Sequence, residues 1–264
     1  MVNLLAAAAL AAATPSATPP PQPEPAMFVV RDADTTVYLF GTFHALDGDP
    51  HWFGNGVRDA FEQSDELVLE TLLPEGPDAP AQLRAALGRP SGKPSPAFIA
   101  TTRMAISASR AQGMQVDNGA DMILRHVAES EGKPVEQLET LQFQLNMFNH
   151  LSAGAAATPA DAKVGQPVTA QRDDLVHTMA EMQSAWKRGD QSVFVHMLGQ
   201  LEAGSPETYR LMFTDRNARW ADWIAARLQT PGTVFVAVGA GHLAGKDSVL
   251  VRLAQKGIES ERVY

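Results

Sequence analysis

The stretch TTVYLFGTFH, residues 35–44, is a run of β-branched and aromatic residues that ends in Gly-x-x-His, with His44 as its last residue. The same pattern occurs in TVFVAVGAGH, residues 233–242, which ends at His242. Strands that are apolar on both alternating faces are typical of the covered centre of a largely parallel sheet. Ligands of open α/β sheets bind beyond the carboxyl ends of the strands. We therefore expect the two histidines to converge on one site.

The sequence around the first run predicts a hairpin followed by a strand–helix–strand unit. Residues 27–30 and 37–40 pair as the hairpin, turned by Asp32-Ala33-Asp34. A helix is expected over residues 55–63 and a third strand over residues 66–70. In such a βαβ order the crossover is right-handed and the two strands are parallel.

The middle of the chain is mainly helical by its pattern, with breaks rich in glycine and proline. The better helix candidates are residues 97–112, 121–131, 141–151, 169–187 and 207–228, whereas residues 132–140 are compatible with a short strand. The sheet resumes at residues 233–238, continues through a helix at 243–255 and closes with residues 258–263. The predicted fold is α/β, with a central, mostly parallel sheet split by a large helical insert at about residues 79–228.

The N-terminal residues predict export. Residues 1–13 contain an unbroken apolar run that suits a signal peptide and is too short to span a membrane. No Lys or Arg precedes this run, which leaves a flexible alanine-rich tail as the alternative. Residues 14–26 are rich in proline and predict an extended linker, so the folded domain is expected at residues 27–264. We expect a periplasmic or secreted protein with no transmembrane segment in the mature chain.

The composition excludes several classes of function. With 45% hydrophobic and 19% charged residues among 264, the chain can bury a sizeable core. Its formal net charge of −9 argues against a nucleic-acid surface, which would normally be basic. The absence of cysteine removes disulfides, thiol nucleophiles and cysteine-ligated zinc from consideration. The oligomeric state cannot be predicted from these features.

Three side chains are candidates for a metal site at the predicted strand ends. Glu70 ends an apolar strand and is expected at the same sheet edge as His44, with His242 following the second Gly-x-x-His strand. Two histidines and one carboxylate are a common hydrolytic zinc ligand set, and they also suit manganese or cobalt. Glu70 could instead act as a general acid or base, or be a solvated charge at a strand end. His242 is also expected at a helix entrance, where free N–H groups favour an anion.

Arg216 and Asn217 are further candidates, on the predicted helix at residues 207–228. Helical spacing puts both side chains on stripes that include tryptophan. Polar groups on an apolar face need partners, and a carbonyl or a developing oxyanion of a substrate could be one. A core ion pair, or an arginine whose head reaches solvent, is the structural alternative. Glu139 is a weaker candidate that could only support the others.

These stretches resemble the TraB/GumN family, to which the Tiki proteins are related. The matching segments follow the family's order over nearly the whole mature chain, at residues 38–44, 66–70, 132–140, 216–220 and 235–242. The resemblance implies an α/β fold with a paired Gly-x-x-His site and a glutamate, and metal-dependent peptidase activity. A more distant similarity is to the erythromycin esterase-like group, where a histidine can act as base without a metal.

The sequence therefore predicts a metal-dependent hydrolase of the peptidase kind. His44, Glu70 and His242 would hold a divalent ion, manganese, cobalt or zinc, that activates water for attack on a peptide or another small substrate. Arg216 and Asn217 would orient the substrate or stabilise its oxyanion. One alternative is a metal-independent, esterase-like hydrolase with His44 as base, and another is a non-catalytic ligand-binding protein.

Overall fold

The computed structural model describes residues 24–79, 81, 82, 85, 107, 109–154 and 168–264. Its centre is a six-stranded sheet with the strand order β4-β3-β5-β2-β1-β6. The strands are β1 (Met27–Arg31), β2 (Thr35–Thr42), β3 (Glu66–Leu69), β4 (Val135–Gln137), β5 (Gly232–Gly239) and β6 (Glu261–Arg262). The strands β4, β3, β5 and β2 are parallel to one another, whereas β1 pairs antiparallel with both β2 and β6. The fold is α/β, as expected.

The two quoted apolar runs are the adjacent central strands β2 and β5. They pair in parallel from Thr35 opposite Gly232 to Thr42 opposite Gly239. Their β-branched and aromatic side chains fit a pleated surface that is covered on both faces. Because the register keeps the two glycine-containing ends level, both Gly-x-x-His sequences leave the sheet at the same edge. The prediction of two central strands is confirmed.

The remaining strands extend the sheet on both sides of this pair. The β1–β2 hairpin forms as expected, and its turn is held by a hydrogen bond from the backbone N–H of Thr35 to Asp32 Oδ1, 2.8 Å long. β3 is parallel to β2 but not adjacent to it, since β5 lies between them. Residues 132–140 do contain a short strand, β4, which makes the sequence between β3 and β5 more than a purely helical insert. The expected closing strand at residues 258–263 is reduced to β6.

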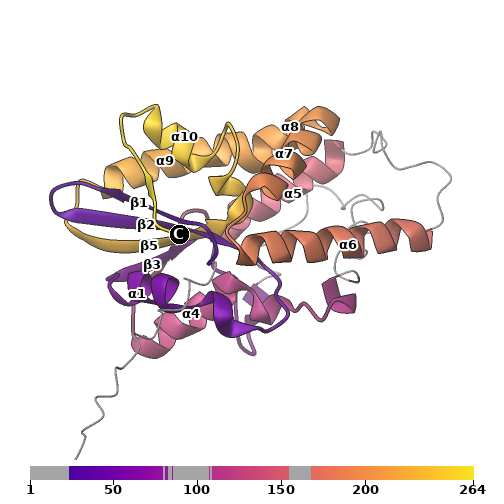
Figure 1. Cartoon of the computed structure of the whole chain (residues 1–264), viewed down its shortest axis with the longest axis horizontal. Coiled ribbons are helices and arrows are strands. Elements are labelled where there is room, and N and C mark those ends of the chain that lie inside the picture. The colour runs from indigo at the N-terminus through magenta and orange to yellow at the C-terminus, as the bar shows by residue number, and fades with distance from the viewer. Residues whose placement is uncertain (1–23, 80, 83–84, 86–106, 108, 155–167) are drawn as a thin grey trace, which may run out of the picture.

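Helices cover both faces of the sheet (Figure 1). The α-helices are α1 (Asn55–Glu62), α4 (Ala120–Glu131), α5 (Leu141–Gly154), α6 (Val168–Lys187), α7 (Ser192–Gly204), α8 (Pro206–Tyr209), α9 (Asp215–Arg227) and α10 (Val249–Ala254). Shorter turns are η1 (Pro50–Trp52), η2 (Val116–Asn118), the π-helical η3 (Arg210–Thr214) and η4 (Ala240–Leu243). One core contains side chains of α1 and α4 packed on the sheet, and a second contains side chains of α9 and α10. Among the described residues no helix has the length and apolarity needed to cross a membrane.

The helix predictions need three corrections. α7 was not expected, because its sequence includes glycine and has only a weak amphipathic pattern. The helix predicted at residues 207–228 is divided into α8, η3 and α9 by the π-helical turn. The helix predicted at residues 243–255 begins only at Val249, so His242 lies in the single turn η4 and not at a helix entrance. The expected signal peptide, most of the expected linker and most of the helix expected at residues 97–112 lie outside the described residues.

A cluster of charges joins the loop after His44 to α6. The ammonium group of Lys187 lies 3.0 Å from carboxylate oxygens of both Asp47 and Asp49. The pKa of Asp49 is lowered mainly by Lys187, and that of Asp47 is lowered by the same group although partial burial opposes the change. These contacts fix the start of the loop against the helix that walls the site described below.

Replacing Lys187 with methionine should destabilise the protein in a pH-dependent way. The two aspartates have lower pKa values in the folded chain, so their contribution is present above their unfolded pKa values and is lost as the pH falls through the folded ones. We expect a loss of about 0.5–1 kcal/mol at pH 7, since the groups are partly exposed. The loss should nearly vanish in strong acid. Urea unfolding of both proteins across this pH range measures it, and a loss that does not depend on pH would contradict the assignment.

Candidate functional site

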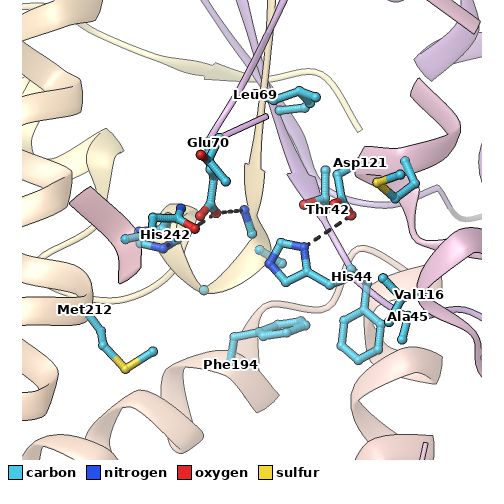
Figure 2. A pocket seen from close by; sticks show the side chains of 18 of the residues that line it. Thr42, His44, Ala45, Leu69, Glu70, Val116, Asp121, Phe194, Met212 and His242 are labelled. Atoms are coloured by element: carbon cyan, nitrogen blue, oxygen red, sulfur yellow. Dashed lines mark hydrogen bonds and ion pairs between the residues drawn. The ribbon is translucent and has the colours of Figure 1, made fainter. Parts of the chain in front are cut away.

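Three of the predicted side chains meet at the carboxyl ends of the central strands. His44 follows β2, Glu70 follows β3 and His242 follows β5, and all three line one cavity of about 570 Å³ (Figure 2). A Cβ atom placed on Gly239 would lie 3.2 Å from Glu70 Oε1 and 3.3 Å from His44 Nε2. Both atoms therefore border the same point, which only glycine leaves open. The structure confirms the prediction that His44, Glu70 and His242 converge at one edge of the sheet.

His44 presents one imidazole nitrogen to the cavity. Its Nδ1 lies 3.2 Å from Asp121 Oδ1, at the start of α4, and its side chain is 61% exposed. Removal from water lowers the pKa of His44, but the hydrogen bond and negative charge of Asp121, with the charge of Glu70, raise it to about 9. Asp121 therefore fixes the ring with Nε2 on the cavity side (Figure 2).

Glu70 is held by two donors. The backbone N–H of Gly239 donates to Oε1 at 2.6 Å, and the guanidinium of Arg216 donates to Oε2 at 2.6 Å. Burial raises the pKa of Glu70, but His242, Arg216 and His44 reverse this effect and hold it at about 2. The carboxylate is therefore ionised and firmly oriented, beside the open point at Gly239.

His242 is buried and uses both of its ring nitrogens. Nδ1 lies 2.6 Å from Asn217 Oδ1, and Nε2 lies 3.1 Å from the guanidinium of Arg216. Because the amide oxygen can only accept and the guanidinium can only donate, the neutral imidazole carries its proton on Nδ1. Burial, with Arg216 and His44, lowers the pKa of His242 to about 3 although Glu70 opposes the shift. The ring packs between Phe213 and Trp220, 4.8 and 4.4 Å away between centroids.

Arg216 connects the elements around the site. Its side chain is 5% exposed and donates to Glu70, to Glu139 at 2.9 Å and to the carbonyl of Met212 at 3.2 Å, besides its contact with His242. Glu139 also accepts from Arg219 and is itself buried. The weaker candidate Glu139 thus supports Arg216 directly. The contacts of Arg216 are those of a buried ion-pair network, the structural alternative considered for this residue.

Both polar side-chain atoms of Asn217 have a partner. Its Nδ2 donates to the carbonyl of Asp247 at 2.7 Å, while its Oδ1 faces His242. The side chain therefore positions His242, and it does not itself line the cavity. Its described contacts favour a positioning role over direct contact with a substrate.

Replacing Asn217 with leucine should lower the free energy of unfolding by about 1–3 kcal/mol, because it leaves the buried Nδ1–H of His242 without an acceptor. Asp222, which is exposed on the same helix, offers a control, and its replacement by asparagine should change stability by less than about 0.5 kcal/mol. Thermal and urea unfolding measure both effects. Equal stability of the leucine variant and the native chain would show that this contact has no structural role.

Two of the three predicted metal ligands, His44 and Glu70, present atoms that a divalent ion could approach. His44 Nε2 faces the cavity while Asp121 holds its other nitrogen, an arrangement common among histidines that bind metals. Because its pKa is raised to about 9, His44 is protonated near neutral pH, and an ion would have to displace the proton on Nε2. Glu70 Oε1 lies beside it at Gly239. His242 Nε2 is 3.7 Å from Glu70 Oε1 but is occupied by Arg216, so it could ligate only after that guanidinium moved. Within the described residues, no group of three or more His, Cys, Asp or Glu side chains is arranged to hold an ion.

Sequence reasoning missed Asp121 and the wall of the cavity. Aspartate is common in the first turn of a helix because the positive end of the helix dipole stabilises its negative charge. Nothing in the sequence therefore distinguished Asp121 from other such residues. The far wall consists of methionine and phenylalanine side chains from α6, α7 and η3, which as isolated residues look like ordinary core: Met179, Met182, Phe194, Met197, Met212 and Phe213. This set is called the apolar wall below.

Comparison with known proteins gives a family and no individual relative. Neither the curated proteins nor the solved structures contain a match to this chain. The family model described as the TraB/PrgY/gumN family matches residues 26–99 and 76–262, which together cover most of the chain and include both Gly-x-x-His sequences, Glu70 and Arg216. The chain with this paired-histidine strand edge belongs to the TraB/PrgY/gumN family.

Proposed function

We propose that the protein is a metal-dependent hydrolase that cleaves an amide bond of the peptide type, with its reaction centre at the open point beside Gly239. The observation that carries this proposal is the meeting of His44 Nε2 and Glu70 Oε1 at that point, inside a cavity large enough for a small substrate. Ligand cavities of proteins typically measure ~300–1,000 Å³. Membership of the family adds support for the paired-histidine site.

In this proposal His44 and Glu70 hold the divalent ion, manganese, cobalt or zinc. The ion would polarise the substrate carbonyl and make a water molecule more acidic. Asp121 keeps the His44 ring in position, and the Gly239 N–H and Arg216 keep the Glu70 carboxylate in position. Arg216 also places a fixed positive charge near the reaction centre, where developing negative charge on a substrate oxygen would be stabilised.

A second candidate is hydrolysis without a metal, with His44 as general base. The hydrogen bond between His44 and Asp121 favours it, because a carboxylate on the far nitrogen is how many catalytic histidines are oriented. With its pKa at about 9, His44 would act as base only in the neutral fraction that grows as the pH rises. The two candidates share the same residues and differ in their need for an ion. Resistance of the activity to chelators separates them.

The test is a hydrolysis screen with peptide and ester libraries, run with a chelator and then with added manganese, cobalt or zinc. The proposal expects activity that the chelator abolishes and one of these ions restores. Activity that survives the chelator and disappears in His44→Ala would support the metal-free candidate. No hydrolysis under any of these conditions, together with ligand binding, would show a binding protein and overturn both.

A further inference from the structure

The cavity is polar at its strand edge and apolar on the opposite side. His44 and Glu70 stand at the strand ends, whereas Phe194 and Met212 lie across the cavity on the helices (Figure 2). Half of the chain's ten methionines line this single cavity, five in all. Methionine is unbranched and flexible, and its thioether adapts to ligands of varied shape. The apolar wall is therefore suited to a flexible apolar group.

The apolar surface continues to the outside of the cavity. Leu73 and Val116 line it and are 42% and 55% exposed, which places both among the large hydrophobic residues most open to solvent in the described part of the chain. Contiguous exposed apolar surface is common at ligand-binding grooves. An occupant can thus keep apolar contact from the wall to the opening.

The position of the cavity in the sheet argues against a peptide that binds by adding a strand. Peptides commonly bind by adding a strand to a free sheet edge. The edges of this sheet are β4 and β6, whereas the reaction centre lies at the ends of the central strands β2, β5 and β3. No described strand edge borders the cavity, so strand addition does not account for binding here, and the apolar wall offers the larger recognition surface.

From these observations we infer that the apolar wall binds a straight acyl chain, and that the substrate is an N-acyl compound whose amide carbonyl lies at His44 and Glu70. This inference rests on the proposed function, since it names the substrate of the same site. Water adds its oxygen to the acyl carbon, the carbon–nitrogen bond breaks and the nitrogen takes the proton. The acyl chain leaves as a fatty acid, and the other product is an amine.

Binding tests the wall without depending on catalysis. Titration calorimetry of the full chain with fatty acids from butyrate to dodecanoate should show affinity rising about two- to fourfold for each added methylene, as expected when a CH₂ group is buried. The rise should stop once the chain fills the cavity. Affinity that does not change with chain length, or tighter binding of an apolar peptide than of any fatty acid, would overturn the inference.

Hydrolysis assays then test whether the acyl chain that binds the apolar wall belongs to the substrate. With N-acyl p-nitroanilides from acetyl to dodecanoyl, in the presence of the activating ion, kcat/KM should follow the same dependence on chain length. Chain-length-dependent binding without hydrolysis would leave the acyl-chain site standing and overturn the proposed function. Hydrolysis whose kcat/KM does not depend on chain length would support the proposed function and overturn the acyl-chain inference.

Two variants on α7 test whether the dependence on chain length arises at the apolar wall. Met197 belongs to the apolar wall, whereas Val195 on the same helix is 46% exposed and lies outside the cavity lining. Met197→Trp should shorten the longest chain that gains affinity, while Val195→Trp should leave that limit as in the native protein. Met179→Trp serves as a second wall variant if Met197→Trp does not fold. Unchanged chain-length limits in a folded wall variant would contradict the assignment of this wall.

Discussion

Replacing Arg216 with methionine is expected to lower the free energy of unfolding by about 3–5 kcal/mol, the usual cost of removing one partner from a buried ion pair. The guanidinium is 5% exposed and is shared by Glu70 and Glu139, whose side chains are 12% and 5% exposed. Methionine would fill much of the space and leave two carboxylates without their main counter-charge. Arg216 is one of the groups that lower the pKa of Glu70, so protonating Glu70 would recover part of the loss and the deficit should shrink as the pH falls.

The matched control is Arg219→Met. Arg219 binds the other oxygen of Glu139 from the same helix but is 46% exposed, so its removal should cost about 0–1 kcal/mol. Urea unfolding of both variants at neutral and acidic pH measures the difference. If Arg216→Met were as stable as Arg219→Met, the buried network would not be the support for Glu70 that its geometry indicates.

Replacing His44 with alanine is expected to have the opposite pattern, a large loss of activity with little loss of stability. The side chain is 61% exposed and its described polar contact is the hydrogen bond to Asp121, so stability should change by less than about 1 kcal/mol. Hydrolysis should fall by about 10²–10⁴-fold or more, because the variant loses both the acid–base group and a proposed ligand of the ion.

A histidine outside the cavity provides the comparison. His126 lies on α4, is 51% exposed and pairs with Glu75. His126→Ala should therefore keep both stability and activity close to those of the native chain. Steady-state kinetics and thermal unfolding of the two variants separate chemistry from folding. Comparable activity in the two alanine variants would remove His44 from the reaction centre.

The central sheet and the meeting of three candidate residues at its edge could be predicted because their signals are local. β2 and β5 are recognisable from apolar residues on both alternating faces, and each is followed by its histidine at a fixed spacing. Glu70 could be found in the same way, as the charge that ends the apolar strand β3. Parallel pairing then brings the three ends together without further information.

The network around these residues could not be predicted because it depends on contacts between distant segments. Whether Arg216 faces a substrate or a carboxylate depends on where α9 packs over the sheet edge, and the sequence left both possibilities open. Asp121 becomes important only because α4 begins beside His44. The π-helical turn η3, which places Met212 and Phe213 at the cavity, has no clear sequence signal.

The most direct test of the central claim, that His44 and Glu70 hold a divalent ion at the strand edge, is elemental analysis of the purified protein. Native protein and His126→Ala, each exposed to manganese, cobalt and zinc and then desalted, should retain one of these metals in stoichiometric amount. His44→Ala and Glu70→Gln should retain none above background. A native protein that holds no metal above background and gains no activity from any of the three would contradict the claim. So would equal metal content in all four proteins.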